Sequence, residues 1–149
     1  YLGYRRIVSE MIMEAPEDVE RLVEADAKEI TKRRNHLHCF LERIIGLGKE
    51  DKIVVFGCGK RGNEVLELIK FAEDKISCLT DNCKSLWKTI KNNHEILAPE
   101  DAVKQYPDAM FIIANKLYAQ DIAAQLRHMG ICETKICIYG ETPDENNPS

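Results

Sequence analysis

The sequence predicts an α/β protein built on a doubly wound parallel sheet, and two observations carry that prediction. From Asp51 onwards, short apolar runs alternate with amphipathic stretches, as strands alternate with helices in a parallel sheet with right-handed crossovers. The first apolar run leads into a Gly-x-Gly-x-x-Gly loop, which a stretch with helical spacing follows. We therefore expect a Rossmann-like sheet of five parallel strands in the order 3-2-1-4-5, preceded by N-terminal helices.

Residues 1–50 are expected to form a separate helical segment. Pro16, followed by two acids, marks the start of a long helix, which should run for about 30 residues. Its apolar stripe from Val19 to Ile45 is longer than the sheet domain needs, so it should bury against a partner subunit, another domain or the edge of the sheet. Residues 4–45 are thus the expected surface for a homodimer or for docking to another domain of the parent protein.

The first strand, expected at residues 52–57, ends in the loop Gly57-Cys58-Gly59-Lys60-Arg61-Gly62. In this pattern Gly57 permits a tight turn, Gly59 lets backbone approach a pyrophosphate, and Gly62 lets the next helix pack close to the strand. The N–H groups at the start of that helix, expected at residues 61–73, would then face the anion.

The other three residues of the loop each allow two interpretations. Lys60 and Arg61 would add positive charge beside a phosphate, or would be solvated loop residues. Cys58 would be a reactive thiol if phosphate-directed N–H groups lower its pKa, or else a small filler residue.

A second strand, expected at residues 76–80, ends at Asp81-Asn82. Asp81 lies about 20 residues past the glycine loop, where an acid accepts hydrogen bonds from a ribose hydroxyl. Because a carboxylate there repels a 2′-phosphate, NAD-like or uridine-type riboses fit better than NADP. Strand, loop, helix, strand and acid in this register are typical of a Rossmann-type nucleotide-binding unit. The alternative is a glycine turn in an α/β scaffold without a ligand.

Three further strands are expected at residues 95–98, 110–115 and 135–139, with helices at 99–105 and 117–129. A ligand of such a sheet binds outside the carboxyl ends of the strands, at the switch between the first and the fourth. Asn115 and Lys116 follow the fourth strand, and Lys116 would contact a phosphate or substrate, or would be a surface lysine. The tail, residues 141–149, is expected to be a linker or a frayed end.

Composition and motifs exclude several function classes. The net charge of −4 indicates no basic face for nucleic acid. No apolar run approaches the ~18 residues of a membrane span, so we expect no membrane insertion. The motifs of α/β-hydrolases, short-chain reductases and P-loop NTPases are missing, so the catalytic residues are unknown, and only Lys116, Tyr118 and Cys58 are acid–base candidates. Because the chain begins at Tyr1, we expect a piece of a larger protein.

Six cysteines raise the question of a metal site: Cys39, Cys58, Cys78, Cys83, Cys132 and Cys137. The C-x4-C pairs at 78/83 and 132/137 would belong to strands three ladder spacings apart, about 14 Å at ~4.8 Å each. We therefore expect no metal, reduced thiols and a cytoplasmic location.

Four stretches form a recognisable pattern: residues 55–62, Thr80-Asp81-Asn82 with Lys84 and Trp87, Ile96 with Pro99-Glu100-Asp101, and residues 111–116. This pattern resembles the Rossmann-like sugar-nucleotide-binding (NAD(P)-binding-like) domains of bacterial polysaccharide and glycan biosynthesis proteins. The resemblance covers residues 51–140 and implies a domain attached to a glycosyltransferase, methyltransferase or sugar acyltransferase. Redox-sensing and CoA-binding Rossmann domains share much of the skeleton. In the family a glycine usually follows the tryptophan, whereas Lys88 does here.

The expected function is that of a nucleotide-binding module of a glycan-biosynthesis protein, without catalysis of its own. It would hold a nucleotide sugar or an NAD-like dinucleotide by residues 57–62, Asp81, Asn82, Asn115 and Lys116. Two alternatives stay open. One is an NAD-dependent oxidoreductase or epimerase domain. The other is a dimerising regulatory module whose nucleotide pocket is a sensor or vestigial.

Overall fold

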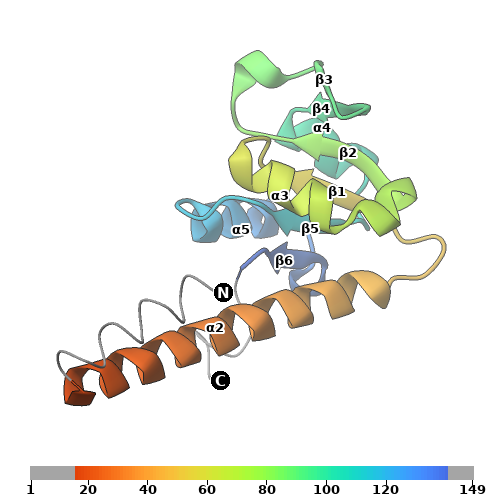
Figure 1. The fold of residues 1–149 in the computed structure, drawn as a ribbon. Helices are drawn as coiled ribbons and strands as arrows, with labels where there is room; N and C mark the ends of the chain where they lie inside the picture. The colour runs from red at the N-terminus through yellow and green to blue at the C-terminus, as the bar shows by residue number, and fades with distance from the viewer. Residues whose placement is uncertain (1–15, 141–149) are drawn as a thin grey trace.

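The structure, a computed structural model, describes residues 16–140, with side chains from residue 27 onwards. The helical residues expected before Pro16 and the tail expected at 141–149 lie outside the described residues. Figure 1 shows one α/β body and a long helix, α2 (Pro16–Ile45), whose first turns extend beyond that body. The expectation of a helix of about 30 residues is confirmed, because α2 has 30.

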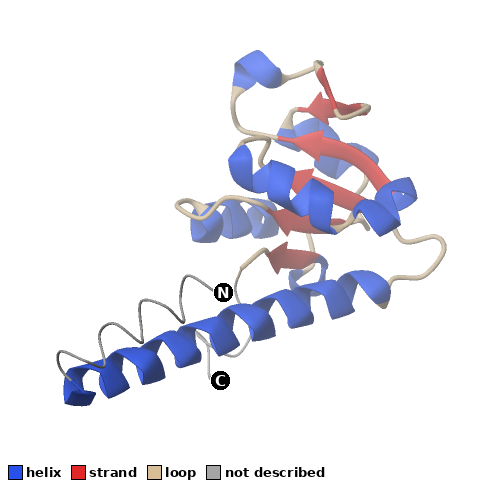
Figure 2. Ribbon diagram, in the orientation of Figure 1, coloured by secondary structure: helices blue, strands red, loops and turns tan. Residues whose placement is uncertain are grey.

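A six-stranded sheet forms the centre of the body, in the order β3-β4-β2-β1-β5-β6 (Figure 2). Its strands are β1 (Ile53–Phe56), β2 (Ile76–Thr80), β3 (Ile90–Lys91), β4 (His94–Leu97), β5 (Met110–Ile113) and β6 (Ile136–Ile138). All pairs are parallel except β3 with β4. The predicted fold class is confirmed, and the five parallel strands have the predicted order. The predicted count of five is wrong, since β3 adds a sixth strand at one edge.

The sixth strand arises from a tight hairpin. Asn92 and Asn93 have φ values of 52° and 67°, the left-handed pair that a two-residue turn between antiparallel strands requires. The hairpin pairs Ile90 with Glu95 and Lys91 with His94. Lys88, which follows the tryptophan, also has a left-handed φ of 66°. The backbone thus keeps a conformation that favours glycine although a lysine occupies it.

Along β1 and β5, side chains alternate between two buried clusters, one on each face of the sheet. On one face Val55 packs with α3 (Lys60–Leu68), the 3₁₀ helix η1 (Lys70–Lys75) and the end of α2. On the other face Val54 packs with α4 (Pro99–Gln105) and α5 (Ala119–His128). Both faces of the parallel strands are therefore buried, as their near-continuous apolar runs predict.

Two predicted helices differ from the observed ones at their ends. The single helix expected at 61–73 ends at Leu68, and a 3₁₀ turn follows it, because Ile69 and Ala72 have non-helical angles. Both residues are buried against the sheet, so packing outweighs helix continuity there. The helix expected from residue 117 begins at Ala119, since Asn115 Oδ1 accepts the Tyr118 N–H at 2.9 Å and turns the chain first.

Among the described side chains of α2, from residue 27 onwards, those in the last turns pack on the sheet. Phe40 and Ile44 are buried in the same cluster as β1 and β5, while Leu37 and Ile45 are 38% and 69% exposed. An Arg43 guanidinium nitrogen also donates a hydrogen bond to the Thr134 carbonyl at 3.0 Å. Three surfaces are expected to cover the apolar stripe of this helix. The edge of the sheet near β6 is the one that the last turns contact. Among the described residues, no helix has both the length and the apolar character needed to cross a membrane.

Candidate functional site

The glycine loop connects β1 to α3, and its three glycines meet different surroundings. Gly57 has a φ of +119°, and a Cβ on it would lie 2.6 Å from the Ala114 carbonyl oxygen at the end of β5. A Cβ on Gly62 would lie 2.1 Å from the Gly57 carbonyl oxygen. By contrast, a Cβ on Gly59 would meet nothing within 4 Å. Gly57 and Gly62 are therefore required by close packing, and Gly59 borders open space.

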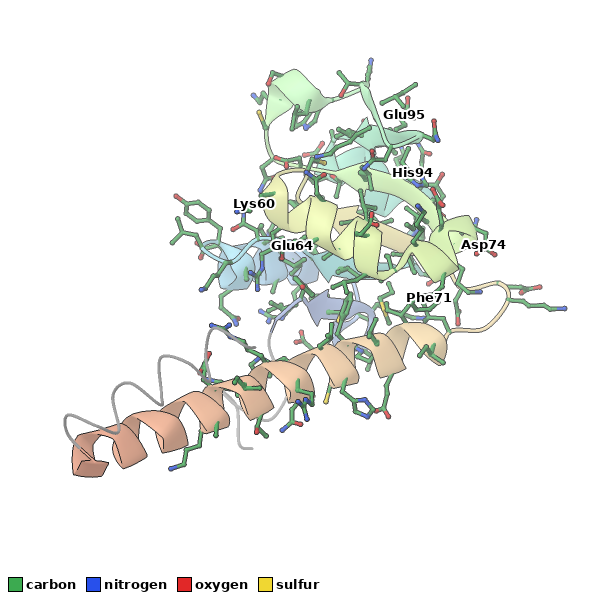
Figure 3. All side chains as sticks on the ribbon, in the orientation of Figure 1. Lys60, Glu64, Phe71, Asp74, His94 and Glu95 are labelled. Carbon is green, nitrogen blue, oxygen red and sulfur yellow. The ribbon has the colours of Figure 1, made fainter. Side chains whose placement is uncertain are left out.

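The start of α3 is open to a ligand. Its N-cap residue is Gly59, no described side chain caps it by a hydrogen bond, and its first turn carries no acid. Lys60 is exposed at this end of the helix (Figure 3). The first N–H groups of a helix carry a partial positive charge and need a partner. This terminus thus has the chemistry of an anion-binding site.

Asp81 ties the glycine loop to the segment after β2. Its Oδ2 accepts the Cys58 N–H at 2.9 Å, and its Oδ1 accepts the Cys83 N–H at 2.9 Å. The Trp87 indole donates a hydrogen bond to the Asp81 carbonyl at 2.7 Å and so anchors this loop. Each carboxylate oxygen has a second lone pair, so Asp81 keeps the capacity to accept a hydroxyl.

Cys58 is a filler residue and not an activated thiol. Its side chain is 8% exposed, and its Sγ donates to the Thr80 carbonyl at 3.6 Å. Burial, reinforced by the charge of Asp81, raises the pKa of Cys58 to about 11. Of the two interpretations of Cys58, the structure supports the filler residue, and Asp81 accepts the Cys58 N–H.

Arg61 turns away from the loop's open side and toward β6. Its guanidinium lies 4.9 Å from the centroid of the Tyr139 ring and donates to the Tyr139 carbonyl at 3.3 Å. The Tyr139 ring in turn makes an edge contact with Phe40 of α2, with centroids 5.1 Å apart. The Arg61 Nε is buried and has no hydrogen-bond partner in the described part of the chain. Of the two loop cations, Lys60 is thus the one that faces solvent.

The remaining predicted site residues lie at the carboxyl edge of the sheet. Asn82 and Gln125 of α5 exchange two amide hydrogen bonds of 3.0 Å each. Asn115 is engaged in the turn described above, and Lys116 is exposed. Next to Lys116, the loop exposes an apolar pair, Leu117 at 80% and Tyr118 at 56%.

Lys91 is a site residue that the sequence did not reveal. Its Nζ donates to the Cys58 carbonyl, so the edge hairpin reaches the glycine loop. The Asn92-Asn93 turn was the available signal, because two asparagines between apolar runs favour a hairpin. A groove of 540 Å³ lies between this hairpin and α3; its walls include Asn63, Leu66 and Glu67 of α3, Lys70 of η1 and residues 91–94. We call it the α3–hairpin groove, and it lies beside the expected site rather than at the switch between β1 and β5.

The thiols and acids of the described residues form no metal site. No group of three His, Cys, Asp or Glu side chains in residues 27–140 is placed to hold a metal ion. All six cysteines are free.

A protein-family model matches more than half of the chain. The family described as C2185-like, N-terminal, matches residues 49–137. No curated protein matches the chain.

Three solved structures match the chain at 14–19% sequence identity, and the two with a TM-score of 0.50 share its fold. RSP, a Rex-family repressor, matches with 19% identity and a TM-score of 0.50 over 70% of this chain and 58% of that one, so this chain spans less than two thirds of RSP. RSP in complex with β-NADH matches with 15% identity and a TM-score of 0.50, over 95% of this chain and 84% of that one. UDP-D-quinovosamine 4-dehydrogenase from Vibrio fischeri matches with 14% identity and a TM-score of 0.49, over 64% and 82%. At these identities the comparisons show the Rossmann-type fold alone.

Proposed function

The chain belongs to the C2185-like N-terminal family, and we propose that it is a nucleotide-binding module without catalysis of its own. The observation that carries the proposal is the uncapped start of α3 behind an open Gly59. A diphosphate at this position would satisfy the free N–H groups and gain from the helix dipole. Lys60 adds a cation on the solvent side. We assign this site to residues 51–140.

The ligand class that we propose is a nucleotide sugar or an NAD-like dinucleotide. Asp81 supports a ribose without a 2′-phosphate, since its carboxylate lies against the glycine loop. RSP, which has a similar fold, was solved in complex with β-NADH, and this supports including NADH among the ligands to test. The resemblance of residues 51–140 to sugar-nucleotide domains supports a place in glycan biosynthesis. The six free thiols support a cytoplasmic location.

An oxidoreductase or epimerase is the weaker alternative. Of its acid–base candidates, Cys58 has a pKa of about 11 and is buried, so it stays a neutral thiol near pH 7. Lys116 and Tyr118 are exposed in the loop after β5.

A thermal-shift panel tests the proposal with NAD, NADH, UDP-sugars, CDP compounds and CoA. A ligand at 100 times its dissociation constant stabilises a protein by roughly 2.7 kcal/mol, which such a measurement resolves easily. Binding without turnover is the expected result. Turnover of a bound ligand would establish the enzyme instead. Silence across the whole panel would contradict nucleotide binding and favour the dimerising regulatory module.

A further inference from the structure

The α3–hairpin groove has the size of a ligand site. Its volume is 540 Å³, and pockets that hold small molecules measure about 300–1,000 Å³. One wall is a face of α3, where residues 63, 66 and 67 lie three and four apart, and η1 continues it with Lys70 and Glu73. The opposite wall is the hairpin, residues 91–94. Figure 3 shows His94 on the hairpin side of this region.

The lining of the groove suits hydroxyl groups. Only Leu66 and Ile76 are apolar among the residues that line it; the others are amides, carboxylates, ammonium groups and an imidazole. His94 is nearly buried, with 13% of its side chain exposed, and lies 3.9 Å from a Glu73 carboxylate oxygen. A flat apolar ring would desolvate these groups without replacing their hydrogen bonds, which costs free energy. A polyhydroxylated ring would replace them, because each hydroxyl both donates and accepts.

Lys91 connects the groove to the glycine loop. It lines the groove, and its ammonium group binds the Cys58 carbonyl, one residue before Gly59. A neutral carbonyl is a weaker partner for an ammonium group than a phosphate is. An anion at the start of α3 would therefore lie within reach of this cation, and a group attached to that anion would have the groove beside it.

We infer that the α3–hairpin groove is the subsite for the sugar of a nucleotide sugar, with Lys91 at its entrance as a phosphate contact. The inference rests on the proposed function and deepens it, because it selects the nucleotide sugar over the NAD-like dinucleotide. The sugar hydroxyls are held by Asn63 and Glu67 of α3 and by the hairpin. The phosphates lie between Lys91 and the uncapped N–H groups.

Calorimetry on the whole chain tests this with UDP-glucose, UDP-N-acetylglucosamine, UDP-galactose and GDP-mannose, each against bare UDP or GDP, and with NADH. We expect at least one sugar nucleotide to bind about tenfold more tightly than its bare nucleotide. Asn63→Ala and Glu67→Ala should each reduce that preference about fivefold and leave the bare nucleotide's affinity within twofold. Glu64→Ala is the matched control, since Glu64 is exposed on α3 but does not line the groove, and it should change nothing. Lys91→Met should weaken sugar nucleotide and bare nucleotide alike, by about tenfold.

Two outcomes would overturn the inference while the proposed function stands. In the first, NADH binds and no sugar nucleotide exceeds its bare nucleotide. In the second, a preference exists and the two groove variants leave it unchanged. If no compound on the panel binds, the proposed function fails together with the inference. Melting temperatures of all variants, measured without ligand, show whether a loss of binding reflects a loss of folding.

Discussion

The glycines of the β1–α3 loop have different surroundings, and only two of the three are required by the backbone. At Gly57 the backbone has a positive φ, at Gly62 a carbonyl leaves no room for a Cβ, and at Gly59 neither constraint exists. The spacing in the sequence predicted the first two roles correctly, because a tight turn and close packing follow from the strand–loop–helix geometry. It did not give the φ of Gly59, which is −87° and accessible to any residue.

This contrast makes Gly59 a separable test of binding. We expect Gly59→Val to abolish nucleotide binding, since its methyl groups would occupy the space that a diphosphate needs, and to leave the melting temperature nearly unchanged. Gly62→Ala is the opposite case and should destabilise the fold by about 1–3 kcal/mol through overpacking. Ligand titration and thermal unfolding on both variants are the measurements. If Gly59→Val binds like the parent, the glycine loop is purely structural.

The thiols differ in reactivity according to burial. Cys58, Cys78 and Cys137 are buried, and burial raises the pKa of each, to about 11 for Cys58 and about 12 for Cys78. Cys83 and Cys132 are exposed, and hydrogen bonds from Thr134 lower the pKa of Cys132. We expect iodoacetamide at pH 8 to modify Cys83 and Cys132 and to spare the three buried thiols, as peptide mass spectrometry would show.

The raised pKa of Cys58 also determines how the free energy of unfolding depends on pH. The folded-state pKa of Cys58 lies above its ordinary value of 9.0, so its contribution to stability is complete below pH 9 and is lost as the pH rises through 11. Denaturant unfolding at pH 8 and pH 10 should show the decline, and Cys58→Ala should reduce it. Rapid alkylation of Cys58 in the folded protein at pH 8 would contradict both expectations.

At the scale of elements, apolar runs predicted the five parallel strands because burial on both faces requires them. Other features of the fold depend on tertiary contacts, which the sequence pattern does not show. The hairpin at 90–95 pairs only two residues per strand, too few to give an alternating pattern. The break after Leu68 follows from the packing of Ile69 and Ala72. The contact of Lys91 with the Cys58 carbonyl depends on the path of the hairpin. The Asn82–Gln125 pair joins residues that are 43 positions apart in the sequence.

Asp81 links two elements, and its removal should therefore affect more than a ribose contact. Asp81→Ala leaves the Cys58 and Cys83 N–H groups without their acceptor. Because this site is partly solvated, we expect a modest destabilisation of about 1–2 kcal/mol. Binding of ribose-bearing ligands should also weaken, by roughly 1.5–3 kcal/mol. Urea unfolding and calorimetry on the same variant separate the two effects. An unchanged affinity together with reduced stability would mean that Asp81 is only a turn residue.

At the scale of the whole molecule, part of the apolar stripe of α2 is buried in the core and part of it is exposed. Its last turns belong to the core, which the sequence allowed as one of three possibilities. Leu37 and Ile45 are 38% and 69% exposed, and they extend the apolar stripe beyond the packed residues. We propose that this exposed stripe, within residues 4–45, forms a homodimer or docks another domain of the parent protein.

Light scattering on the full chain tests the association. We expect a dimer that the double variant Leu37→Glu, Ile45→Glu converts to a monomer, because both side chains are exposed and their replacement leaves the core intact. Glu42→Lys, also exposed on α2, serves as the control for a change of charge alone. A full chain that is monomeric at every concentration would leave docking to another domain as the role of the stripe.

The stack of Arg61, Tyr139 and Phe40 joins the glycine loop to α2 through three contacts. Arg61 belongs to the first turn of α3, so a displacement of that turn on ligand binding would alter its contacts with Tyr139, which in turn contacts Phe40 of α2. Thermodynamic linkage makes such a connection reciprocal. To the extent that filling the loop biases the orientation of α2, a partner seated on α2 changes the loop's affinity by the same factor. The small molecule and the partner protein would then each report the other's presence.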